Sequence, residues 1–90
     1  MPRVPMDSFA EGTEIVRVYL AGSLREAERV EAVLDAAAVE YAPEPERYGV
    51  PGSLGLWQRT GVGFWVLADR LDPAADALER AGLTSGLVRR

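Results

Sequence analysis

The stretch AGSLREAERVEAVLDAAAVEY, residues 21 to 41, contains a helix start, a helix and a return to extended chain. Ser23 and Glu26 form the Ser-x-x-Glu pattern of a capping box, which predicts a helix beginning at Leu24. Small and medium apolar residues then recur at helical spacing, at Ala27, Val30, Val33, Leu34 and Ala37. Such a narrow stripe can lie close on a sheet, so the stretch predicts a fold that contains both helices and strands.

Extended segments lie on both sides of this helix. EIVRVYL, residues 14 to 20, is rich in β-branched and aromatic side chains and predicts a first strand. VEYA, residues 39 to 42, predicts a short second strand. VGFWVLA, residues 62 to 68, is apolar on both faces, which is typical of the central strand of a sheet.

A second helix follows the third strand. Asp72 and Pro73 predict its N-cap and first residue, and Gly82 predicts its end. The order strand, helix, strand, strand, helix is that of a ferredoxin-like sandwich, an α+β fold with both helices on one face of an antiparallel sheet. Leu87 and Val88 are candidates for a short final strand at an edge.

The chain of 90 residues has room for one domain. Residues 1–13 contain prolines and a glycine without periodicity and predict a flexible N-terminal segment, and residues 14–90 form the predicted ferredoxin-like domain. Residues 43–61, with three prolines and four glycines, predict a long loop between the second and third strands. An alternative assigns LWQRT, residues 56–60, to an extension of the third strand's hairpin.

Composition excludes several classes of function. The chain contains neither cysteine nor histidine, so we expect no metal site and no cofactor. A formal net charge of −4 disfavours binding to nucleic acid. No apolar run approaches the roughly 20 residues of a membrane span, and no secretion signal is recognisable, so we expect a cytoplasmic protein without a membrane partner.

No residue is predicted to be catalytic. The paired carboxylates Glu44 and Glu46, and Asp69 and Asp72, lie in polar stretches where solvated loop acids and a helix cap explain them. The glycines of GVPGSLG, residues 49–55, and TGVG, residues 60–63, lack the lysine of a P-loop and the spacing of a dinucleotide fingerprint. The expected protein is therefore not an enzyme.

Two segments, RVYLAGSLREAERVEAVLDAAAVEYA and FWVLADRLDPAADAL, resemble a small family of prokaryotic signal-transducing proteins of unknown function. That family is itself likened to the PII nitrogen-regulatory proteins. The resemblance, which covers most of residues 15 to 82, implies a ferredoxin-like subunit that binds small effectors and contacts target proteins through the loop after the second strand. The family pattern usually ends the first helix with glycine, where this chain has Ala38.

Two functions fit these observations. The first is a non-enzymatic regulatory or protein-interaction module for signal transduction, and the second is a small-metabolite or nucleotide sensor whose 43–61 loop closes over the ligand. The residues predicted to make loop contacts are Arg47, Tyr48, Trp57 and Arg59. The same loop could instead be a flexible insertion without a function, or a segment that covers the open face of the sheet.

A partner or ligand face is predicted on the sheet. Strict alternation turns Val16, Val18 and Leu20 toward the helices. The opposite face would then carry Ile15, Arg17, Tyr19, Trp65 and Leu67. A monomer rarely leaves such a patch open to water, so we expect a second copy to cover it in a two-fold homodimer. The alternative cover is the loop, through Leu54, Leu56 and Trp57.

Overall fold

The structure is a computed structural model that describes residues 3–5, 9, 12–49 and 58–88. Its elements in chain order are β1 (Ile15–Ala21), α1 (Leu24–Ala36), β2 (Ala42–Gly49), β3 (Gln58–Leu67), the 3-10 helix η2 (Ala68–Arg70) and α2 (Leu71–Arg80). The predicted α+β class and the β-α-β-β-α order are confirmed.

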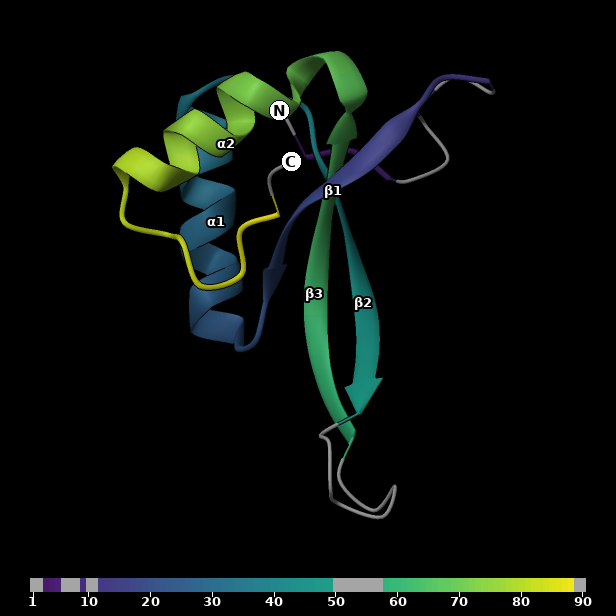
Figure 1. Cartoon of the computed structure of the whole chain (residues 1–90), viewed down its shortest axis with the longest axis vertical. Coiled ribbons are helices and arrows are strands. Elements are labelled where there is room, and N and C mark those ends of the chain that lie inside the picture. The colour runs from purple at the N-terminus through teal and green to yellow at the C-terminus, as the bar shows by residue number, and fades with distance from the viewer. Residues whose placement is uncertain (1–2, 6–8, 10–11, 50–57, 89–90) are drawn as a thin grey trace.

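The three strands form one antiparallel sheet in the order β1-β3-β2, with the apolar β3 in the centre as predicted. Both helices lie on the same side of this sheet (Figure 1). The predicted final strand is reduced to a short segment at the outer edge of β1, where Leu87 and Tyr19 form an antiparallel bridge. Two backbone hydrogen bonds of 2.9 Å flank that bridge, from Leu20 to Gly86 and from Val88 to Val18.

The core lies between the helices and the sheet. Its largest fully buried side chains come from β1, α1, the residue before β2, β3 and α2: Tyr19, Tyr41, Phe64, Leu34, Leu78, Val18, Val30 and Val66. The Tyr41 and Phe64 rings pack at a tilt, with centroids 5.8 Å apart. The predicted apolar stripe of α1 is therefore its buried face.

The start of α1 confirms the helix predicted at Leu24. Ser23 is the N-cap, and its Oγ accepts a hydrogen bond of 3.1 Å from the Glu26 backbone N–H. The Glu26 carboxylate accepts from the backbone N–H of Gly22 at 2.9 Å. A capping box would use the N–H of Ser23, so the carboxylate caps the chain one residue earlier than predicted.

Both helices end in the same hydrogen-bond pattern. After α1, the N–H groups of Ala38 and Val39 donate to the carbonyls of Asp35 and Leu34, both at 3.1 Å. This pair of bonds is a Schellman motif, which needs a left-handed residue at the position that Ala38 occupies, and its φ is 57°. After α2 the same position is occupied by Gly82, with φ 81°.

Ala38→Gly should stabilise the domain by up to about 1 kcal/mol, because glycine adopts positive φ without the steric penalty of a Cβ. Urea unfolding of the two proteins measures this difference. Ala37→Gly is the matched control, since Ala37 has φ −83° and gains nothing from glycine. Destabilisation by Ala38→Gly would contradict the assigned helix end.

The start of α2 differs from the prediction. The 3-10 turn η2 leads from β3 directly into α2, and the N–H of Leu71 already donates to Ala68. The chain is therefore helical before it reaches Asp72, so Asp72 is in the first turn and is not the N-cap. A carboxylate there still interacts favourably with the helix dipole.

The prediction of a loop over residues 43–61 is wrong over most of that range. The prediction of a short strand at VEYA, residues 39–42, is also wrong. β2 begins at Ala42 and pairs with β3 from Ala42↔Trp65 to Gly49↔Gln58. Pro43 and Pro45 are tolerated because β2 is an edge strand, where a proline nitrogen can face away from the neighbouring strand. The start of β3 at Gln58 agrees with the alternative hairpin extension over residues 58–60, and residues 50–57 lie outside the described part of the chain.

Part of the N-terminal segment predicted to be flexible lies against the residue that precedes β2. Arg3 forms a parallel bridge with Tyr41, and the N–H of Val4 donates to the Tyr41 carbonyl at 2.9 Å. The Arg3 guanidinium also lies 3.5 Å from the Glu31 carboxylate of α1. This segment therefore contacts the backbone of Tyr41, just before β2.

Candidate functional site

A β-bulge in β1 changes which side chains share a face of the sheet. Arg17 pairs with Trp65 and Tyr19 with Phe64, so Val18 is an extra residue between them. The alternation therefore shifts after Val18, and Tyr19 is turned to the helix side, where it is fully buried. The prediction that Tyr19 belongs to the partner face is wrong. Leu20, which pairs with Gly63, takes its place.

We call the side of the sheet away from the helices the open face. Among the residues whose side chains the structure describes, the register assigns to it Ile15, Arg17, Leu20, Ala42, Glu44, Glu46, Gly61, Gly63, Trp65 and Leu67. Four of the five residues predicted for a partner or ligand face lie on it: Ile15, Arg17, Trp65 and Leu67. Ala42, Gly61 and Gly63 are buried and the other residues are half-buried, and neither helix covers this side of the sheet (Figure 1).

One carboxylate joins the three strands across the open face. Glu46 of β2 forms an ion pair with Arg17 of β1 and accepts a hydrogen bond of 3.3 Å from Trp65 Nε1 of β3. The Arg17 and Glu46 side chains are 35% and 23% exposed. Gly63 leaves room for this arrangement, because a Cβ there would collide with the Glu46 carboxylate.

The sequence interpretation missed the role of Glu46, which it treated as a solvated loop acid. The error followed from the assigned loop, because in a strand Glu44 and Glu46 must share one face. Glu44 lies opposite Gly63, and within the described chain its carboxylate has no hydrogen-bond or ion-pair partner. Asp69 and Asp72, the other predicted pair, are exposed as expected.

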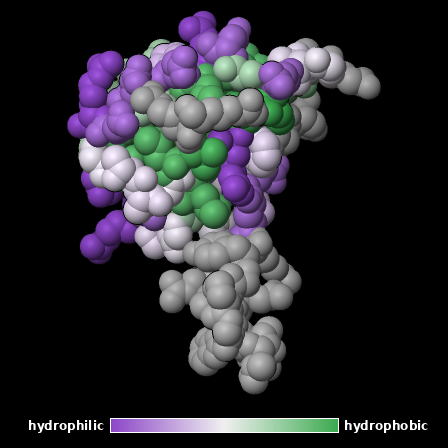
Figure 2. Space-filling model, in the orientation of Figure 1, coloured by the Kyte–Doolittle hydropathy of each residue, from purple (hydrophilic) through white to green (hydrophobic). Residues whose placement is uncertain are grey.

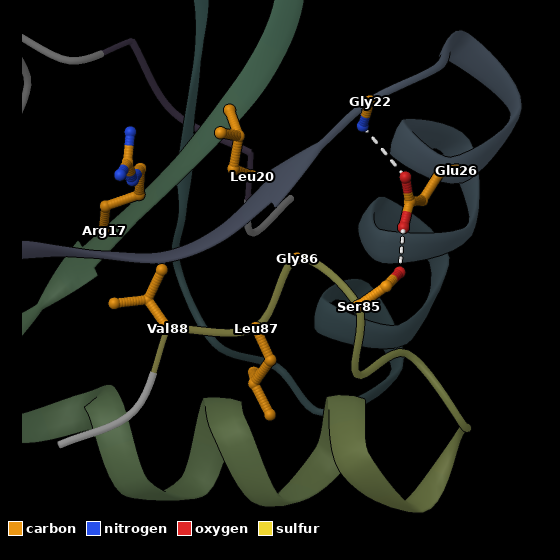
Figure 3. Close-up of a pocket in the computed structure, with 8 residues that line it drawn as sticks. All are labelled: Arg17, Leu20, Gly22, Glu26, Ser85, Gly86, Leu87 and Val88. Carbon is orange, nitrogen blue, oxygen red and sulfur yellow. Dashed lines mark hydrogen bonds between the residues drawn. The ribbon is translucent and has the colours of Figure 1, made fainter. Parts of the chain in front are cut away.

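A second polar cluster lies where β1 meets α1, at the helix side. The Glu26 carboxylate accepts from the Gly22 N–H and, at 3.2 Å, from the Ser85 hydroxyl (Figure 3). It also accepts from the Tyr19 hydroxyl at 2.5 Å. The bonds from Tyr19 and Gly22 lower the pKa of Glu26. Burial, and then the bond to Glu26, raise the pKa of Tyr19.

This cluster has a structural role rather than the properties of a catalytic site. Three donors occupy the Glu26 carboxylate, and a tyrosine with a raised pKa is a poorer base or nucleophile at neutral pH. Its members come from β1, α1 and the segment after α2. The cluster therefore holds the C-terminal segment beside the start of α1.

The lowered pKa of Glu26 predicts a pH dependence of stability. A carboxyl group whose folded pKa lies below its ordinary 4.5 stabilises the fold above about pH 4.5 and loses that contribution as the pH falls through the folded pKa. Glu26→Gln should cost about 1 kcal/mol at neutral pH, reduced by partial exposure. Urea unfolding at falling pH should show wild type and variant converging. A constant difference would contradict the assignment.

A shallow hollow of about 460 Å³ lies along the C-terminal segment. Its lining includes Arg17, Leu20, Leu87 and Val88. Figure 3 shows Arg17 and Leu20 on one side of the β1 ribbon and Leu87 and Val88 on the other. Figure 2 shows hydrophobic surface in this region with hydrophilic residues around it. The apolar surface continues to the open face, because Val88, which is 39% exposed, lines a neighbouring hollow with Ile15 and Trp65.

The predicted loop contacts lie elsewhere. Tyr48 pairs with Arg59, and Arg47 with Thr60, near the end of the β2–β3 ribbon that extends past the helices (Figure 1). At about 3.3 Å per residue, this end is about 20 Å from the Ala42↔Trp65 pair. The side chains of Arg47, Tyr48 and Arg59, and all of Trp57, lie outside the described part of the structure. Along the backbone, the positions of Arg47, Tyr48 and Arg59 therefore lie apart from the strand pairs that carry Arg17 and Trp65.

Other candidate sites find no support in the geometry. Gly61 and Gly63 lie within β3 rather than in a loop that could surround a phosphate. Across residues 3–5, 9, 12–49 and 58–88, no group of three or more acidic residues is placed to hold a metal ion. In the same residues, no helix has the length and apolar character to cross a membrane.

Comparisons with protein-family models, curated proteins and solved structures give no match to this chain. The resemblance to the prokaryotic signal-transducing family therefore stays a hypothesis based on the quoted segments.

Proposed function

We propose that this protein is a non-enzymatic regulatory or protein-interaction module that self-associates through its open face. The observation that carries the proposal is the apolar content of that face. Ile15, Leu20, Trp65 and Leu67 are half-buried on the side of the sheet that neither helix covers. Contiguous apolar patches on a protein surface usually mark an interaction site, and Trp and Arg are enriched where binding energy concentrates.

The edges of the sheet are less suited to association than its open face. Pro43 and Pro45 have no N–H group, so the outer edge of β2 lacks backbone donors at those positions. The outer edge of β1 is occupied from Val18 to Leu20 by the backbone of Gly86 and Val88. A partner strand would have to displace this segment or tolerate missing donors, which favours stacking on the face.

A role in signal transduction is the functional context that the sequence resemblance implies. A regulatory domain of this kind needs a contact surface and no catalytic group. The sensor hypothesis loses most of its basis, because residues 43–49 and 58–61 of its closing loop form strands. A thermal-shift screen with nucleotides and central metabolites still separates the two: stabilisation that rises with ligand concentration would favour the sensor.

Sedimentation equilibrium of the wild-type chain tests the proposal. We expect a monomer–dimer equilibrium with the dimer dominant at high micromolar concentration. A chain that stays monomeric throughout that range would contradict the proposal, and the open face would then need a cover other than a second copy.

A further inference from the structure

Where its side chains are described, residues 15–46 and 61–67, the open face carries more carboxylates than cations. Arg17 supplies one guanidinium there, whereas Glu44 and Glu46 are both carboxylates. Glu46 is paired with Arg17, but Glu44 has no partner within the described chain. Covering this face with a second copy would remove Glu44 from water without compensation, and an unpaired buried charge costs several kcal/mol. Self-association therefore needs a cation near Glu44.

Arg17 can supply that cation. Its guanidinium has five N–H donors, and its ion pair with Glu46 is made through Nη1. The side chain extends over the centre of the sheet, since its Cδ lies 3.2 Å from the place of a Cβ on Gly63. A second carboxylate that approaches from above the sheet can therefore reach free donors of the same guanidinium.

The symmetry of a dimer brings Glu44 to this point. When two open faces stack, a two-fold axis between them that runs along β3 places β2 of one copy opposite β1 of the other. Glu44 and Leu20 both pair with Gly63, so they lie at the same height on β2 and β1. The partner's Glu44 then lies above β1 near Leu20, beside the Arg17 side chain that leans over Gly63.

We infer that the open face is a self-complementary interface in which Arg17 of each copy pairs with the partner's Glu44. This inference rests on the proposed function and deepens it, because it names the partner as a second copy and the pair that sets the register. Arg17 then bridges its own Glu46 and the partner's Glu44, and the two-fold axis makes this contact twice. Charge pairs of this kind fix the alignment of an apolar interface and disfavour other partners.

A charge exchange tests the pairing. Glu44→Arg places two arginines opposite each other in a homodimer, and Arg17→Glu does the same with carboxylates. We expect each variant alone to associate at least about tenfold more weakly than wild type. An equimolar mixture should form a heterodimer, because at these two positions one chain then presents only guanidinium groups and the other only carboxylates. Native mass spectrometry and sedimentation measure all three samples.

The controls carry the same charge changes away from the open face, on exposed positions of α1: Glu28→Arg and Arg25→Glu. They should dimerise as wild type does. Circular dichroism tests whether each variant is folded. If a charge-reversed variant is unfolded, a double-mutant cycle with the milder substitutions Arg17→Gln and Glu44→Gln tests the same pair. Two unaffected homodimers, or a mixture no tighter than its components, would overturn the pairing alone. A monomeric wild type would overturn the proposed function as well.

Discussion

Trp65→Glu should convert the dimer into a folded monomer. Trp65 lies on the central strand, between Arg17 on β1 and Ala42 on β2, so a glutamate there adds a third carboxylate to the open face. Stacking would bury that charge unpaired, at a cost of several kcal/mol, which weakens dimerisation by about a thousandfold or more. Because Trp65 is half-buried within one chain and donates to Glu46, the substitution should also lower the free energy of unfolding of the monomer, which should nevertheless remain folded around its separate helix-side core.

Leu24→Glu is the matched control for this substitution. Leu24 is a large apolar side chain that is 73% exposed at the start of α1, away from the open face. The same apolar-to-acidic change should leave dimerisation intact there. Sedimentation gives the association constants, and urea unfolding monitors the fold. A Trp65→Glu protein that dimerises as tightly as Leu24→Glu would contradict the placement of the interface.

Gly86→Ala should destabilise the protein by about 1–3 kcal/mol or detach the C-terminal segment. A Cβ at Gly86 would collide with the carbonyl oxygen of Leu20 and lie 2.8 Å from Tyr19 Cε1. The carbonyl belongs to the β1 backbone, which cannot move without disturbing the sheet. The hydrogen bond between Leu20 N–H and the Gly86 carbonyl should be lost with the segment. Amide exchange at Leu20 and urea unfolding report the two effects.

Alanine substitutions at two other glycines are controls that distinguish this collision from the general effects of replacing glycine with alanine. At Gly82 no atom lies within 4 Å of a Cβ, but φ is 81°, so alanine should cost about 1 kcal/mol through backbone strain and leave Leu20 protected. At Gly63 a Cβ meets the end of the flexible Glu46 side chain, which can move aside. If the Leu20 amide is as well protected from exchange in Gly86→Ala as in Gly82→Ala, the assigned packing is wrong.

The sequence predicted the features that depend on local patterns. Ser23 and Glu26 predicted the start of α1 because a cap involves only neighbouring residues. The apolar residues on both faces of VGFWVLA predicted the central strand, because a strand flanked on both sides by other strands usually has few polar residues. The family pattern, which usually ends this helix with glycine, left open whether Ala38 is left-handed, and the structure gives it a φ of 57°.

The errors arose where pairing between strands decides the structure. Pro43, Pro45 and four glycines favour a loop locally, yet pairing with β3 makes residues 42–49 a strand. The bulge at Val18 is a feature of the β1–β3 register, which single-strand alternation cannot express. Tyr19 was therefore assigned to the wrong face, and Leu20 and Glu46 were missed. Glu46 would have been found by extending the alternation of β2 past its prolines.

The central claim is that two copies meet through their open faces with the helices outermost. The chain has no cysteine, so Glu28→Cys on the exposed side of α1 allows one spin label in each copy. With sheets about 10 Å apart and a helix about 10 Å thick on each outer side, double electron–electron resonance should give a separation above about 35 Å. A distance below about 25 Å, or no dipolar signal at high micromolar concentration, would contradict the claim.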